Sequence, residues 1–380
     1  MAIRSIKAIP IAIREPTERE LAYGKISVRT NVIVVVEDDS GVRGVAETTP
    51  IPYRWGCEET VEGVVAAINN YVAPLILGED PTRIGMLLDR MTSRVGDMQY
   101  ARSGVSEALY DLSGRLAGLP VYKLIGGMVH EKLASTWSLA HRSEKELAEE
   151  AQWAIKQGYK WIKIKIGSKH PEQDVRNVAL IRDVIGPDHL IHVDANAGYS
   201  YLDAVHILPR IEQYRPRFIE QPIAGWDLDG MSKLRRMLKT PLMADESVRS
   251  YRDMQEVIRR GAADGVLLKL NKCGGIRETQ KIADLAEAAN MTVYPSLHFC
   301  TSIGVAAHLQ FYCTLPRLTP GELNQGALLY EHDLIKKTIP AVNGEIEVPT
   351  GPGIGVELEE SLLERARTDK KRETGTKIED

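Results

Sequence analysis

The chain has 380 residues, of which 43% are hydrophobic and 26% charged, ordinary proportions for a globular protein with one large or two average domains. The net charge is −4 and no long basic run occurs, which argues against a nucleic-acid partner. No apolar run is long enough for a membrane-spanning helix, and charges and proline interrupt the N-terminal segment too often for a signal peptide. We therefore expect a soluble protein with no membrane partner.

The four cysteines are scattered and form no CxxC pair: Cys57, Cys273, Cys300 and Cys313. This spacing argues against a disulfide framework and against a structural zinc site. It favours a reducing compartment, so we expect the protein in the cytoplasm.

The N-terminal part has the pattern of an α+β unit. Residues 3–13 and 28–37 have the β-branched, alternating residues typical of strands. A helical region follows from about residue 58 to 127, and residues 103–116 within it place apolar side chains at helical spacing. This helix should end at Gly118, just before a proline.

From about residue 133, short apolar strands alternate with helices. The helix after the first strand should begin with a capping box at Ser143 and Glu146 and end at Gly158. The strand candidates are residues 133–139, 160–167, 190–195, 218–221, 241–245, 265–270, 292–297 and 317–322. Eight strands with helical crossovers predict an α/β fold, a parallel (β/α)8 TIM-type barrel. The alternative is an open doubly wound sheet, but no GxGxxG follows the first strand.

Polar residues lie within these apolar strands or at their carboxyl ends. They are Lys163, Lys165, Asp194, Asn196, Glu220, Asp245, Glu246, Lys269, His298 and Glu322. From one strand to the next they are 24–29 residues apart, which is the length of a strand–helix repeat. Each should therefore project onto the same mouth of the barrel, where barrel enzymes build their active sites.

Three of these residues are carboxylates that end consecutive strands. Asp194, Glu220 and Asp245 would repel one another at a shared mouth unless a cation neutralised them. A hard divalent ion with oxygen ligands is the simplest solution, Mg²⁺ before Mn²⁺. Salt bridges to nearby arginines are the structural alternative.

Three lysines accompany the carboxylates. Strand alternation points Lys163 and Lys165 to the barrel interior, and Lys269 lies further round. Lysines inside a barrel are costly without a partner or a role. Two lysines on opposite faces of one carbon can remove a proton on one side and deliver it on the other, whereas the alternative is simple pairing with the acids. A metal-free Schiff-base aldolase would need one lysine and no carboxylate trio, and a silent binding protein would need none of these groups.

Five segments resemble motifs of the enolase superfamily, and more narrowly of its muconate-lactonizing subgroup. They are Lys163-Ile164-Lys165, Asp194-Ala195-Asn196, Ile219-Glu220-Gln221-Pro222, Ala244-Asp245-Glu246-Ser247, and Leu268-Lys269-Leu270-Asn271-Lys272 before Gly274-Gly275. Residues 101–127 also resemble the segment that links the two domains of the family. The resemblance covers nearly the whole chain, with the motifs in the family's order.

The resemblance implies a barrel domain at residues 128–340 and an α+β capping domain at residues 1–127. The C-terminal segment, residues 341–380, would return to the capping domain and end in a charged tail. Asp194, Glu220 and Asp245 would hold Mg²⁺, and Lys165 and Lys269, with Lys163 beside them, would be the catalytic residues.

The implied chemistry is removal of the proton next to a substrate carboxylate to give a metal-stabilised enediolate. We expect an isomerase, either a muconate cycloisomerase-like enzyme or a racemase or epimerase, and the alternative is a dehydratase of the same superfamily. Asn196, Glu246, His298 and Glu322 would support the site or bind substrate.

Two positions depart from a clean match. His298 lies where the mandelate-racemase branch has its catalytic histidine, but that branch's partner aspartate falls at Lys269 here, so we expect a substrate or core contact. Glu322 resembles the eighth-strand Glu of muconate cycloisomerases. Related dipeptide epimerases have Asp-x-Asp there, whereas this chain has Glu322-Leu323-Asn324.

The substrate is a small-molecule carboxylate that the sequence does not name. The capping loops, about residues 15–29 and 51–59, would select it, with Tyr23 and Trp55 as candidate contacts. Closed homo-oligomers are common among soluble enzymes, so we expect one here.

Overall fold

The computed structural model describes residues 1–21, 24–51, 59–140, 143–323, 330 and 332–369, with the backbone alone described for residues 16–21 and 24–26. Tyr23, Trp55 and Cys57, and most of the charged tail, lie outside these residues. No helix in the described part of the chain is long and apolar enough to span a membrane.

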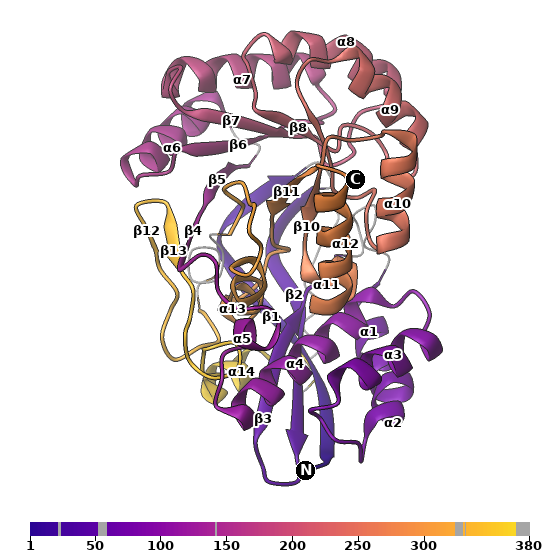
Figure 1. Cartoon of the computed structure of the whole chain (residues 1–380). Helices are drawn as coiled ribbons and strands as arrows, with labels where there is room; N and C mark the ends of the chain where they lie inside the picture. The colour runs from indigo at the N-terminus through magenta and orange to yellow at the C-terminus, as the bar shows by residue number, and fades with distance from the viewer. Residues whose placement is uncertain (22–23, 52–58, 141–142, 324–329, 331, 370–380) are drawn as a thin grey trace.

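An antiparallel sheet with the strand order β1-β2-β3 opens the chain (Figure 1). Its strands are β1 (Ile3–Leu21), β2 (Gly24–Asp38) and β3 (Arg43–Thr48). The first two contain the predicted strands at residues 3–13 and 28–37, whereas β3 was not predicted. Five of its six residues are buried, because the helix α4 (Gln99–Ala117) covers it.

The helices of the N-terminal part are α1 (Val61–Ala67), the π-helical turn η1 (Ile68–Val72), α2 (Ala73–Ile76), α3 (Ile84–Arg94), α4 and α5 (Val121–Leu124). Of these, α1, η1 and α4 pack against the sheet. A Cβ atom on Gly44 would lie 2.1 Å from the Ala108 carbonyl oxygen, so glycine permits the close approach of β3 and α4. The predicted end of α4 is confirmed, since Gly118 adopts a left-handed conformation there.

The second part of the chain is a curved parallel sheet covered by helices. In spatial order its strands are β11 (Thr292–Pro295), β10 (Gly265–Leu268), β9 (Leu242–Ala244), β8 (Phe218–Glu220), β7 (Leu190–Asp194), β6 (Trp161–Lys165) and β5 (Thr136–Leu139). The helices are α6 (Glu144–Lys156), α7 (Pro171–Ile185), α8 (Tyr201–Glu212), α9 (Leu228–Met237), α10 (Tyr251–Arg260), α11 (Leu270–Cys273), α12 (Ile276–Ala288) and α13 (Ser302–Tyr312). Figure 1 shows α6 to α9 outside β6, β7 and β8. The expected α/β barrel-type fold with an N-terminal cap is confirmed, and so is the Ser143–Glu146 capping box of α6.

The first and the eighth predicted strands differ from the prediction. Residues 133–139 split, because β4 (Lys132–Ala134) leaves the barrel for a separate sheet and only β5 joins the parallel one. Residues 317–322 form no continuous strand. Gly321 and Glu322 instead bridge in parallel to Ser135 and Ser296, so that they lie between the two edges of the seven-stranded sheet.

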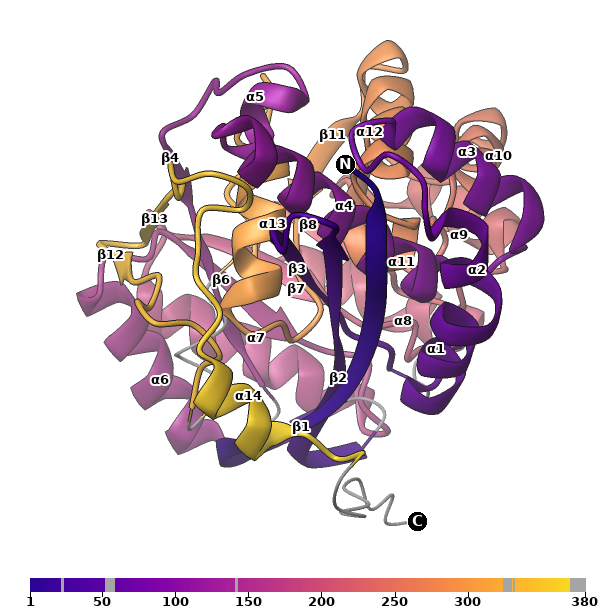
Figure 2. The same ribbon diagram turned by 90° about the horizontal axis from the view of Figure 1, so that it is seen from below.

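The C-terminal segment contacts both parts of the chain. The strands β12 (Ala341–Val342) and β13 (Glu345–Glu347) pair with β4 in the small sheet. The helix α14 (Glu360–Ala366) lies beside β1, as Figure 2 shows from below, and Arg367 bridges to Ile11. The exact division at residues 127 and 340 stays a prediction.

Candidate active site

The ionisable residues predicted for the barrel mouth do meet at the carboxyl ends of the parallel strands. The register aligns Lys165 with Asp194 and Asp194 with Glu220 across β6, β7 and β8. Asp245 follows β9 directly, and its backbone N–H donates to the Gln221 side chain at 2.9 Å. Parallel strands with matched ends therefore place the three carboxylates in a row.

Lys163 contacts the first two carboxylates of the row and also Glu322. Its ammonium is 2.9 Å from Asp194, 2.8 Å from Glu220 and 2.9 Å from Glu322, and the side chain is 1% exposed. Burial disfavours its charge, but the three carboxylates hold the pKa of Lys163 well above its usual value. Lys163 is thus a buried cation that neutralises the acids at two strand ends and the acid Glu322.

Lys165 and Lys269 bind different members of the row. The Lys165 ammonium donates to Asp194 at 2.6 Å and to the Asn196 side-chain oxygen at 2.9 Å. Lys269 instead forms a buried ion pair with Asp245. The two lysines therefore occupy opposite ends of the carboxylate row.

Lys272 is a second buried partner of Asp245. The sequence pattern around Lys269 includes Lys272 but predicted no role for it. Its ammonium lies 2.7 Å from a carboxylate oxygen of Asp245 and also donates to that residue's backbone carbonyl. Burial opposes its charge, yet Asp245 keeps the pKa of Lys272 above the usual value. This ammonium fixes the carboxylate at the third strand end.

Glu220 is the least satisfied carboxylate of the row. Lys163 and His192 lie within ion-pair distance, but neither carboxylate oxygen meets hydrogen-bond geometry with a described residue. Burial, together with repulsion from Asp194 and Asp245, raises the pKa of Glu220 to about 8. The surrounding lysines therefore do not fully compensate the negative charge of a buried Glu220 carboxylate, and an additional cation would stabilise it.

His192 is a functional candidate that the sequence reasoning missed. Its ring nitrogen Nε2 lies 2.6 Å from Glu220, and the ring packs between Phe218 and Tyr294. Burial, then the charge of Lys163, holds the pKa of His192 well below its usual value, so the ring is neutral. Strand alternation two residues before Asp194 was the signal that could have found it.

Glu322 joins the site although its segment is not a strand. Burial raises the pKa of its carboxyl, but the charges of Lys163 and then Lys165 outweigh this and lower it to about 2. The Glu322 carboxylate accepts a hydrogen bond from the Lys163 ammonium at 2.9 Å. Asn196 and Glu246 also meet, because the Asn196 amide donates to Glu246 at 3.3 Å.

His298 lies at the end of the segment after β11 and is 1% exposed. The Tyr100 hydroxyl of α4 is 3.3 Å from its ring nitrogen Nδ1, and the two rings are stacked. A residue of the N-terminal part thus orients this histidine, which sequence spacing alone could not show.

A buried polar network joins β3 and α4 of the N-terminal part to the segments that follow Lys269 and His298 in the barrel. The carboxylate of Glu47 on β3 accepts bonds from Asn31, Thr301 and Gly304. Asn271 donates to the Glu47 backbone carbonyl, and its amide is 3.5 Å from Glu107 of α4. Burial raises the pKa of Glu47 to about 7 and that of Glu107 to about 8.

The carboxylate row fits a divalent cation in its chemistry. Asp194, Glu220 and Asp245 offer buried oxygen ligands, and those of Glu220 have no hydrogen bonds within the described residues. Among those residues, however, no three His, Cys, Asp or Glu side chains already have the spacing of a metal site, because lysine ammoniums take the carboxylate oxygens. The predicted contacts Tyr23 and Trp55 lie outside the described residues.

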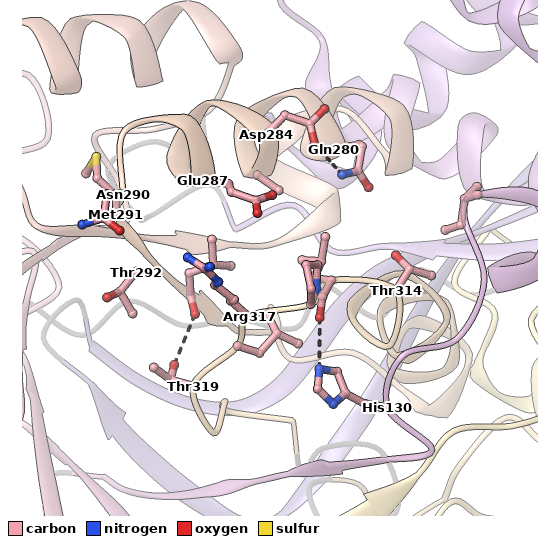
Figure 3. Close-up of a pocket in the computed structure, with 16 residues that line it drawn as sticks. His130, Gln280, Asp284, Glu287, Asn290, Met291, Thr292, Thr314, Arg317 and Thr319 are labelled. Carbon is pink, nitrogen blue, oxygen red and sulfur yellow. Dashed lines mark hydrogen bonds between the residues drawn. The ribbon is translucent and has the colours of Figure 1, made fainter.

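A hollow of about 550 Å³ lies away from this cluster, beside the start of β11 (Figure 3). α12 and the segment after α13 form its walls, and Arg317 lies in its middle. His130 is 3.1 Å from the Leu315 carbonyl oxygen within the wall. The amino end of β11 is the opposite end of the strand from His298, so this hollow is not the candidate active site.

Comparison with known families matches both parts of the chain. Residues 7–126 match the N-terminal domain of mandelate racemase / muconate lactonizing enzyme, and residues 146–362 match the family described as enolase C-terminal domain-like.

Similar proteins include isomerases with two different reactions. The chloromuconate cycloisomerase of Cupriavidus pinatubonensis is 31% identical over 355 residues, which cover 92% of this chain and 95% of that protein. The N-succinyl-L-Arg/Lys racemase of Bacillus cereus is 30% identical and covers 94% of this chain and 95% of its own. The crystal structure of muconate lactonizing enzyme from Pseudomonas fluorescens complexed with muconolactone has a TM-score of 0.93 and 30% identity, covering 96% of this chain and 99% of that one.

Proposed function

The chain belongs to the mandelate racemase / muconate lactonizing enzyme family of the enolase superfamily, and from this premise we propose that it is a Mg²⁺-dependent isomerase. Its reaction would remove the proton next to a substrate carboxylate, as a cycloisomerase or as a racemase or epimerase. Members of the superfamily generally use a divalent metal ion. The observation that carries the proposal is the carboxylate row with Lys165 at one end and Lys269 at the other.

Asp194, Glu220 and Asp245 would hold the metal ion, with Mn²⁺ as a possible substitute for Mg²⁺. Bound there, a divalent cation supplies positive charge that stabilises the negative charge developing on the substrate carboxylate. The hydrogen-bond deficit of the buried Glu220 carboxylate supports this assignment. Lys272 would keep Asp245 in place through its bonds to both the carboxylate and the backbone.

Lys165 and Lys269 would act as base and acid on opposite faces of the substrate α-carbon. In this structure each ammonium is paired with a carboxylate. Acid–base catalysis requires the lysine that takes the α-proton to start neutral and the lysine that delivers a proton to start charged. Lys163 would stay charged throughout, because three acids surround it. Its fixed ammonium would bind a carboxylate oxygen of the substrate and keep the site from acquiring excess negative charge.

The substrate class proposed is a small carboxylate. The relatives include cycloisomerases and an N-succinyl amino acid racemase, so cis,cis-muconate and N-succinyl amino acids are the first compounds to assay. A homo-oligomer remains our expectation for the assembly.

Solvent deuterium exchange tests the division of work between the lysines. Lys165→Ala and Lys269→Ala should each stop turnover, while each variant of a racemase still exchanges the α-proton of one enantiomer, the opposite one in each case. Lys281→Ala is the matched control, because Lys281 pairs with Glu278 on α12 away from the row. Equal exchange of both enantiomers by both variants would contradict the proposal.

A further inference from the structure

Asp174 is a buried carboxylate at the start of α7 that the proposed chemistry does not use. Its side-chain oxygen Oδ2 accepts hydrogen bonds from the Gly167 and Ser168 backbone N–H groups, both at 3.0 Å, and from the Tyr199 hydroxyl at 2.7 Å. Its other oxygen is buried and has no hydrogen-bond partner in the described chain. Burying an acid costs folding free energy, and the three hydrogen bonds to Oδ2 offset part of that cost.

The three donors belong to the loop that follows Lys165, the last residue of β6, and to the turn that carries Asn196. Gly167 and Ser168 lie in the loop after β6, whereas Tyr199 closes the turn after β7. These loops touch backbone to backbone, since a Cβ atom on Gly167 would lie 2.2 Å from the Ala195 carbonyl oxygen. Asp174 therefore holds both loops at their point of contact.

The turn after β7 has a strained backbone that persists only where surrounding contacts stabilise it. Asn196 and Ala197 are consecutive non-glycine residues with φ values of 44° and 59°. In this conformation the Asn196 side-chain oxygen accepts from the Lys165 ammonium, and its backbone N–H donates to Asp194 at 2.8 Å. A relaxed turn would withdraw the acceptor that fixes the direction of the Lys165 side chain.

We infer that Asp174 is a positioning residue that sets the place of the Lys165 ammonium through the two loops it joins, without touching substrate. The inference rests on the proposed role of Lys165 as one of two acid–base lysines. No described contact links Asp174 to Lys269. Loss of Asp174 should therefore slow proton transfer on the Lys165 face of the substrate and leave the Lys269 face unaffected. Tyr199 connects Asp174 to the turn that carries Asn196. Burial and the nearby Asp174 carboxylate raise the pKa of Tyr199, so its hydroxyl stays protonated and can donate.

Crystal structures of Asp174→Ala and of the unchanged chain test the inference without a substrate. Alanine offers no acceptor to the Gly167 and Ser168 backbone N–H groups, so the loop should be released and the Lys165 ammonium should move out of reach of the Asn196 oxygen. Asp203→Ala is the control, since Asp203 lies in the first turn of α8 and its carboxylate accepts from the helix cap Ser200. An Asp174→Ala structure in which Lys165 and Asn196 remain in contact overturns the inference.

A double-mutant cycle adds the kinetic test, using cis,cis-muconate or the enantiomers of N-succinyl-arginine. Asp174→Ala should lower kcat by about 100-fold with little change in KM, the scale of a catalytic group displaced by about 1 Å. Tyr199→Phe removes one bond of three and should lose less. In a Lys165→Ala background, Asp174→Ala should leave exchange on the Lys269 face unchanged, whereas a general structural role would reduce it. Full activity of Lys165→Ala itself would defeat the proposed function, and the crystal structures would still decide the positioning role.

Discussion

Replacing Glu107 by glutamine should stabilise the protein at alkaline pH. Glu107 is fully buried, its oxygen Oε2 has no hydrogen-bond partner among the described residues, and burial raises its pKa from 4.5 to about 8. The folded state therefore keeps a proton that the unfolded chain loses near pH 4.5. The stability that this proton contributes is fully present below pH 4.5 and is lost as the pH rises toward 8, by about 1.4 kcal/mol per pH unit.

Urea unfolding between pH 5.5 and 7.5 measures this dependence. Over those two pH units the Glu107 proton accounts for about 3 kcal/mol, and Glu107→Gln should remove that share of the slope. Glu47 also has a raised pKa of about 7, so a residual slope of the same sign should remain in the variant. Glu62→Gln on the exposed side of α1 is the control. Parallel curves for Glu107→Gln and the unchanged chain would refute the argument.

Three further predictions concern the candidate site. Asp245→Asn should weaken Mg²⁺ binding in calorimetry by on the order of 10–100-fold or more and abolish metal-dependent turnover, whereas full activity after exhaustive EDTA treatment would contradict the metal assignment. Lys163→Met removes the cation shared by Asp194, Glu220 and Glu322 and should lower kcat by about 100-fold or more; an unchanged rate would reduce Lys163 to a structural cation. His298→Asn should raise KM several-fold with a small loss in kcat, whereas a collapse of kcat with KM intact would favour the dehydratase.

The spacing of polar residues along the sequence predicted which strand-end residues lie side by side at one end of the sheet. Side chains alternate along a strand, and parallel strands joined by helices all end at the same side of the sheet. Lys163, Asp194 and Glu220 therefore had to share one mouth once the strands were identified. The barrel-type fold followed from the same periodicity, because eight apolar segments at the spacing of strand–helix repeats favour a closed parallel arrangement.

Tertiary structure alone decided which groups pair and which segments complete the sheets. Glu322 reaches Lys163 across 159 residues from a segment that forms isolated bridges. The strand β3 pairs with β2 and is buried under α4. Asp174 bonds two loops that local patterns treat separately. Local propensity and periodicity act over one or two turns of chain, whereas these contacts depend on the packing of distant elements, where a displacement of about 1 Å makes or breaks a hydrogen bond.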